Sequence, residues 1–246
     1  MNVMKMNRNF SLLSKGIYNH HHNILNYCLE YSKPLDSLRK NMPILKDLEM
    51  ETKEHFGRGA DMMITILQGI WLCDLVNSYK FNNILELGTF TGMSSICMAS
   101  GIGKNGRVTT CDIDMDAISI AKRYIDKCGF QDTIITNHCN ASDLLTRLDH
   151  KFDMIFIDAD KKGIPTYVEH IINNGLLNPN GLIVIDNALF QGKVTDKDDT
   201  TPMAVDMHKS NKYLYNHNMI STYTILPLFD GMGIAKLKNP HTYDKY

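Results

Sequence analysis

Short apolar runs alternate with amphipathic segments along most of the chain. The five apolar runs are rich in Ile, Leu, Val, Thr and Phe, as buried strands are, and cover residues 84–86, 108–112, 133–136, 154–158 and 182–186. The segments between them place apolar residues at helical spacing and cover residues 94–99, 117–127, 142–148 and 167–174. This alternation predicts an α/β fold with a parallel sheet and helices on both of its faces.

The pattern changes after residue 186. A loop over 188–202 and a helix over 203–216 lead into two strand-like runs, 220–228 and 233–237, which are separated by an Asp-Gly turn. Two such runs joined by an Asp-Gly turn predict an antiparallel hairpin. The predicted fold is therefore a Rossmann-like, seven-stranded, mostly parallel sheet with an antiparallel C-terminal hairpin strand.

Extra helices are expected before the sheet begins. Apolar residues recur at helical spacing over 17–41, where Pro34 breaks the pattern, and they predict one or two helices outside the sheet. Residues 62–76 are apolar enough for a buried helix, with weak capping at most. Residues 44–60 are charged and match neither period, so the pattern leaves their structure open.

The chain of 246 residues has room for one large α/β domain. No repeat, low-complexity linker or change of composition divides it. We expect a flexible N-terminus over 1–16 and a single domain over 17–246. Within that domain, the N-terminal helices are expected over 17–60 and the Rossmann-like core over 61–240.

The overall charge narrows the class of partner. Lys and Arg total 26 against 27 Asp and Glu, so the formal net charge is -1. A chain this close to neutral has no field to draw it onto nucleic acid or an anionic membrane. The first ten residues lack an apolar core of signal-peptide length, and the six cysteines form no CxxC pair. We expect a cytoplasmic protein with reduced thiols.

A glycine turn follows the first predicted strand of the sheet. Gly88 and Gly92 flank it with the spacing G-x-x-x-G, which differs from the G-x-G-x-x-G of nicotinamide enzymes. Glu86 stands two positions before the first glycine, where it suits a cationic ligand better than a pyrophosphate. Asp112 ends the next strand, in position to accept hydrogen bonds from ribose hydroxyls. Together these residues fit an adenosine with a positively charged tail, as in S-adenosylmethionine (SAM), whereas glycines alone at a strand end are common.

Polar residues also end the fourth and fifth predicted strands. Asp158 follows one, and Asp186 and Asn187 follow the next. The carboxyl ends of neighbouring parallel strands meet at one edge of a sheet, so these three side chains are expected together. Carboxylate and amide oxygens are hard ligands suited to Mg²⁺. The alternative is that they form turns and helix caps, and it is strongest for Asp160.

Four segments in register resemble one family. ELGTFTGMS at 86–94, FIDADK at 156–161, DNALFQGKV at 186–194 and LPLFDGMGIA at 226–235 are similar to the cation-dependent class I SAM O-methyltransferases. This is the group of caffeoyl-CoA and catechol O-methyltransferases and their bacterial relatives. The similarity covers about residues 18–238. It implies methyl transfer from SAM to a hydroxyl of a small vicinal-diol aromatic of catechol or caffeoyl type.

The resemblance also implies roles for single residues. Cofactor contacts would come from Ile64, Glu86, Gly88, Thr89, Ser94, Asp112, Ala141 and Asp160. Asp158, Asp186 and Asn187 would hold Mg²⁺ or another divalent cation. Lys161 would be the general base, with Asp158 beside it as a second catalytic residue. The sequence departs from the family at Phe190, where a Trp is usual, at Ile64, where a small polar residue is usual, and in the acidic stretch 193–202, and these departures concern the acceptor.

Three other functions share parts of this pattern. A SAM-dependent nucleic-acid methyltransferase is disfavoured by the near-zero charge and the lack of a basic stripe. A non-catalytic, cofactor-binding partner subunit is disfavoured because Lys161 and the three cation ligands are all present. A nicotinamide dehydrogenase is disfavoured by the glycine spacing. Calorimetric titration with SAM against NAD separates the dehydrogenase from the others.

The predicted helices also bear on assembly. The segment over 17–41 and the apolar helix over 62–76 exceed what one face of a sheet needs for cover, and related enzymes are often dimers. We therefore predict a homodimer. Sedimentation at micromolar concentration should give about twice the chain mass of 28.0 kDa, and a mass equal to that of one chain would contradict the prediction.

Overall fold

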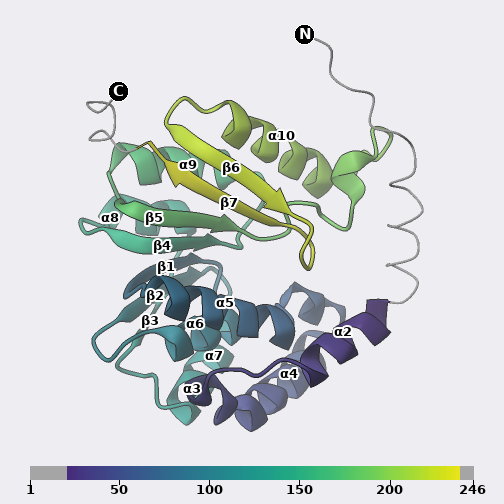
Figure 1. Ribbon diagram of the computed structural model, residues 1–246, viewed down its shortest axis with the longest axis vertical. Helices are drawn as coiled ribbons and strands as arrows, with labels where there is room; N and C mark the ends of the chain where they lie inside the picture. Colours follow the sequence, from purple (N-terminus) through teal and green to yellow (C-terminus); the bar gives the residue numbers. More distant parts are fainter. Residues whose placement is uncertain (1–20, 239–246) are drawn as a thin grey trace. The chain divides into compact units, whose positions relative to one another are not determined.

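Seven strands form one sheet in the order β3-β2-β1-β4-β5-β7-β6 (Figure 1). The strands are β1 (Asn83–Leu87), β2 (Arg107–Asp112), β3 (Ile134–His138), β4 (Phe152–Ile157), β5 (Leu177–Ile185), β6 (Ile220–Leu226) and β7 (Met232–Leu237). The first five are parallel to one another, and β7 pairs antiparallel with both β5 and β6. The predicted fold class is confirmed, including the C-terminal hairpin.

The computed structural model describes residues 21–238 of the chain. The chain divides into two compact units, residues 1–34 and 35–246. Helix α2 (His21–Glu30) belongs to the first unit, where Ser32 Oγ donates a hydrogen bond to the Cys28 carbonyl at 2.5 Å after the helix ends. The expected flexible N-terminus over 1–16 lies outside the described residues.

Helices cover both faces of the sheet in the second unit (Figure 1). Five helices pack on one face: α3 (Asp36–Arg39), α4 (Met42–Phe56), α5 (Ile66–Tyr79), α6 (Met93–Gly101) and α7 (Met115–Lys127). Three pack on the other: α8 (Ala141–Arg147), α9 (Ile164–Asn173) and α10 (Pro202–Asn216). Because successive strand residues face opposite sides, Ile84 joins the first core and Leu85 and Leu87 join the second. Glu86 therefore points to the same face as Ile84, the face of α5 and α6.

The order of the strands changes direction between β1 and β4. From β1 the chain runs outward through β2 and β3, and it then returns to place β4 on the other side of β1. Open α/β sheets bind ligands at such a point, outside the carboxyl ends of the strands. There the Asp158 backbone N–H donates to the Leu87 carbonyl at 2.8 Å, so the residues after β1 and β4 lie in contact.

Several boundaries differ from the sequence-based expectation, each for a local reason. The charged segment over 44–60, whose structure the pattern left open, is helical: it lies in α4 and in the 3₁₀ helix η1 (Gly57–Met62) that follows. Helix α5 starts at Ile66 with Thr65 as its N-cap, whose side chain accepts a hydrogen bond from the Gln68 N–H at 3.2 Å. The N-cap of α8 is Asn140, whose side chain accepts a hydrogen bond from the Ser142 N–H, so the helix begins at Ala141, one residue before the expected start.

Between residues 21 and 238, no single helix has both the length and the apolar composition needed to cross a membrane. Only the pair Met42–Met62 and Ile66–Tyr79, bent by 70° at the break between them, reaches that length and composition when the two are counted together.

The close approach of β1 and β4 gives a test of the fold. A Cβ atom at Gly88, where φ is +105°, would lie 2.3 Å from the Asp158 carbonyl oxygen. Gly88→Ala should therefore lower the free energy of unfolding by about 3 kcal/mol, because backbone on both sides of the clash must move. Gly129→Ala is the matched control, since φ is +73° there but nothing lies within 4 Å of the added atom. It should cost about 1 kcal/mol in denaturant unfolding, and equal losses in the two variants would contradict this account.

Candidate functional site

Glu86 is a buried carboxylate with one unsatisfied oxygen. It is 0% exposed, and Ser95 Oγ, from the first turns of α6, donates a hydrogen bond to its Oε2. Its Oε1 has no hydrogen-bond partner in the described part of the chain. Burial raises the pKa of Glu86 to about 7, although the polar side chains of Ser94, Ser95 and Thr110 act to lower it. A buried acceptor without a donor indicates a place for a donor from a ligand, preferably a cationic one.

The glycine turn connects β1 to α6 and is tied to β2. The N–H groups of Gly88 and Thr89 both donate to the Cys111 carbonyl at 3.0 Å, and the hydroxyls of Thr89 and Thr110 are 2.6 Å apart. Helix α6 then begins after Gly92, where φ is +92°. The two glycines let the turn pack closely against its neighbours, because a Cβ at Gly88 would lie 2.3 Å from the Asp158 carbonyl oxygen and one at Gly92 would lie 3.1 Å from Ala121 Cβ.

Asp112 ends β2 and faces the same turn. Its Oδ2 accepts from the N–H of Phe90 at 2.7 Å, and its Oδ1 accepts from the N–H of Asp114 at 3.0 Å. The carboxylate is half-buried, and each oxygen has a remaining lone pair. The structure thus brings Glu86, Gly88, Thr89, Ser94 and Asp112 together around one turn, and their contacts with a cofactor stay a prediction.

Asp158, Asp186 and Asn187 also lie together. Asp158 and Asp186 directly follow neighbouring strands in which Ile157 pairs with Ile185, and the Asp186 N–H donates to the Ile157 carbonyl at 3.0 Å. Asp186 is 2% exposed, and its Oδ1 accepts from the Asn187 N–H at 2.7 Å. Burial, and then the negative charge of Asp158, raise the pKa of Asp186 to about 7. Two close carboxylates in a buried place favour a cation between them.

Lys161 forms an ion pair at the same edge of the sheet. Its Nζ lies 3.0 Å from Asp158 Oδ1, and the two side chains are only 9% and 18% exposed. Burial raises the pKa of Asp158, and the positive charge of Lys161 acts in the opposite direction. Lys161 is therefore directed at the carboxylates, unlike its exposed neighbour Lys162.

The remaining predicted residues are less directly placed. Both oxygens of Asp160 bond locally, Oδ1 to the Tyr167 hydroxyl and Oδ2 to the Gly163 N–H at 2.8 Å. Ala141 is buried at the start of α8, and Ile64 is buried just before α5. Cofactor contacts at these three residues stay predictions.

Two polar residues at this edge were not predicted from the sequence. Gln68 Nε2, from α5, donates to Asp186 Oδ2 at 2.7 Å. Asp230, in the turn between β6 and β7, accepts from Asn187 Nδ2 at 3.3 Å. Gln68 is a polar residue within an apolar run, and Asp230 belongs to an Asp-Gly turn, so the sequence sets both residues apart. Neither pattern shows which side chain the residue bonds to in the folded chain.

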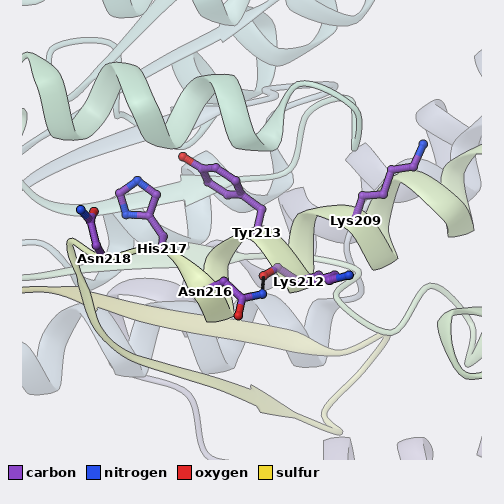
Figure 2. A pocket seen from close by; sticks show the side chains of 6 residues that line it. All are labelled: Lys209, Lys212, Tyr213, Asn216, His217 and Asn218. Carbon is purple, nitrogen blue, oxygen red and sulfur yellow. Dashed lines mark hydrogen bonds between the residues drawn. The ribbon is translucent and has the colours of Figure 1, made fainter.

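Two further features bear on where a ligand could bind. Within residues 21–238, no cluster of three or more His, Cys, Asp or Glu side chains could hold a metal ion. The predicted trio contains only two residues of these types, Asp158 and Asp186, because Asn187 would contribute a carboxamide oxygen. A hollow of about 510 Å³ lies along the second half of α10, and none of the predicted site residues lines it (Figure 2). It is lined by Lys209, Lys212, Tyr213, Asn216, His217 and Asn218.

The chain is similar to known proteins along most of its length. A family model described as O-methyltransferase matches residues 36–238. A catechol O-methyltransferase of Niastella koreensis is 36% identical over 70% of this chain and 80% of its own length. The Dictyostelium discoideum protein named Probable caffeoyl-CoA O-methyltransferase 1 is 31% identical over 88% of this chain and 92% of its own. A crystal structure of an O-methyltransferase from Bacillus cereus in complex with SAH has a TM-score of 0.72 and 27% identity, covering 87% of this chain and 96% of that one.

The pKa of Glu86 predicts how stability depends on pH. Because this pKa is raised from 4.5 to about 7, the folded chain binds a proton more tightly than the unfolded chain, and the contribution of Glu86 to stability falls as pH rises between those values. Glu86→Gln removes the titrating group. Its free energy of unfolding relative to wild type should therefore rise between pH 4 and pH 8 by on the order of 3 kcal/mol. Denaturant unfolding across this range measures the difference, and parallel curves for the two proteins would contradict the prediction.

Proposed function

The chain belongs to the O-methyltransferase family, and from this premise we propose that it methylates one hydroxyl of a small vicinal-diol aromatic, of catechol or caffeoyl type. The methyl donor is SAM, and a divalent cation such as Mg²⁺ binds beside the acceptor. The names of the Niastella and Dictyostelium relatives support the acceptor class, and the SAH in the Bacillus cereus structure supports the donor.

The observation that carries this proposal is the unpartnered Oε1 of Glu86 beside the glycine turn. SAM has an ammonium group in its methionine tail and a positive charge on its sulfur, so a buried carboxylate with one oxygen that lacks a donor matches it. The ribose hydroxyls match the free lone pairs of Asp112. Glu86 and Asp112 come from the neighbouring strands β1 and β2, so the nucleoside would lie at the carboxyl ends of these strands, between the two acidic residues.

The donor set at the ends of β4 and β5 fits a hard divalent cation. Asp158 and Asp186 supply carboxylates and Asn187 a carboxamide oxygen, which are ligands that Mg²⁺ accepts while it keeps open positions. When bound there, a divalent cation would orient two vicinal oxygens of the acceptor and lower the pKa of the attacked hydroxyl. A cation at Asp158 would also compete with Lys161 for that carboxylate and so release its amine from the ion pair.

Lys161 is the group that takes the proton. In the transfer, the acceptor oxygen forms a bond to the methyl carbon as the bond from that carbon to sulfur breaks, and the hydroxyl proton passes to the amine of Lys161, which must first have given its own ammonium proton to the solvent. The products are a methyl ether and SAH.

Phe190, half-buried three residues after Asn187, offers an aromatic face near the acceptor, and Lys193 Nζ lies 5.7 Å from the centre of its ring.

Removal of the cation tests the two halves of the site separately. A chelator should abolish methyl transfer to a catechol, added Mg²⁺ should restore it, and calorimetric binding of SAM should stay nearly unchanged, because Glu86 and Asp112 lie on the earlier strands. Asp186→Ala should behave like the chelator, since it deletes one of only two anionic ligands. Full activity in chelator would contradict the cation assignment but not the SAM assignment.

The role of Lys161 is tested by a pair of neighbouring substitutions. Lys161→Ala should keep the binding of SAM and of the cation and lose about 10²–10⁴-fold in kcat, the range for a general base. Lys162→Ala removes the same charge from an exposed position and should leave kcat unchanged. A kcat for Lys161→Ala within a fewfold of wild type would exclude Lys161 as the base.

A further inference from the structure

The loop that follows β5 is held in an unusual backbone conformation. The φ angle is +56° at Asn187, +44° at Phe190 and +56° at Gln191, and Gly192 continues at +77°. L-residues rarely adopt this left-handed region, so three of them in six positions persist only where contacts from outside the loop hold them. Asn187, one of the three proposed ligands of the cation, belongs to this segment.

Those contacts come from the turn between β6 and β7. The Gln191 N–H donates to Asp230 Oδ1, and the Leu189 N–H donates to the Asp230 carbonyl at 3.0 Å. The Ala188 N–H donates to the Gly231 carbonyl at 2.8 Å. The turn between β6 and β7 thus accepts hydrogen bonds from the backbone of Ala188, Leu189 and Gln191, although the turn and the loop are far apart in the sequence.

Asp230 also determines which way the Asn187 carboxamide faces. Its Oδ2 accepts from Asn187 Nδ2 at 3.3 Å. An ionised carboxylate can only accept hydrogen bonds, so it engages the NH₂ end of the carboxamide and leaves the other end, Oδ1, for a different partner. Oδ1 is the only atom of this side chain that can act as a ligand for a hard cation.

We propose that Asp230 is a positioning residue of the cation site, which fixes the Asn187 carboxamide with Oδ1 presented to the cation and holds loop 187–192 in its left-handed form. Asp230 is not itself a ligand; it acts through Asn187. The inference rests on the proposed function, because it takes the cation site as given. It differs from a purely electrostatic role, in which Asp230 would attract a cation through its charge alone.

The test uses Mn²⁺ as the probe, with free Mn²⁺ measured by electron paramagnetic resonance on the full chain. Asp230→Ala should weaken Mn²⁺ binding about 10–100-fold, the usual effect of removing a group that orients a metal ligand. Asp230→Asn keeps the shape but has one acceptor oxygen in place of two, and it should weaken binding about tenfold. Asp149→Asn, at a side chain that is 96% exposed, removes the same charge and should bind Mn²⁺ as wild type does.

A double-mutant cycle separates orientation from charge. If Asp230 acts through Asn187, then Asp230→Ala added to Asn187→Ala should weaken Mn²⁺ binding by less than about twofold. An equal loss in both backgrounds would overturn the proposal in favour of a charge effect. Wild-type Mn²⁺ affinity in Asp230→Asn would overturn the proposal as well. This isosteric variant preserves folding, so it provides the test if Asp230→Ala melts without a cooperative transition.

The proposed function can fail independently in the same experiment. Wild-type protein that binds no Mn²⁺ would overturn both the cation site and this inference. Wild-type protein that binds Mn²⁺ while the Asp230 variants bind it equally well would overturn the inference alone. Calorimetric binding of SAH, which uses the other half of the site, should stay within about twofold of wild type in every variant, and a larger loss would show general disruption and overturn the positioning role.

Discussion

The carboxyl ends of β1 and β4 approach so closely that no side chain fits between them at Gly88. A Cβ there would meet the Asp158 carbonyl, and the Asp158 N–H bonds to the Leu87 carbonyl across the same gap. This contact brings the first strand of one half of the sheet beside the first strand of the other. Glu86 and Asp158 consequently lie at one edge of the sheet, where SAM and the acceptor of the proposed reaction would bind side by side.

Both buried carboxylates are supported from the same layer of helices. Ser95 of α6 bonds to Glu86, and Gln68 of α5 bonds to Asp186. These two helices can pack closely because glycines face their partners: a Cβ at Gly69 would lie 2.5 Å from Cys97 Sγ, and one at Gly101 would lie 2.3 Å from the Cys73 carbonyl oxygen. Small residues within the helical layer thus set the positions of polar groups at the edge of the sheet.

The sequence predicted those parts of the molecule that depend on local pattern. Strands that end in acidic residues indicated Asp112, Asp158 and Asp186, because an apolar run that stops at a carboxylate places that charge at the ligand-binding edge of a parallel sheet. The pattern over residues 44–60 did not identify helix α4, since its exposed face is so charged that the apolar period is hidden. Gln68 and Asp230 were not identified as site residues because their partners lie 118 and 43 positions away in the sequence. Only the folded chain shows which distant residue completes a hydrogen bond.

The environment of Glu86 links ligand binding to proton release. With its pKa raised to about 7, this side chain is partly protonated in the free protein at neutral pH. A cationic group that occupies Oε1 favours the ionised form and expels that proton into the solvent. The heat measured on binding should then differ between buffers of different ionisation enthalpy, by an amount that counts the protons released. Calorimetry in two such buffers would report the charge state of a residue that is completely hidden from the solvent.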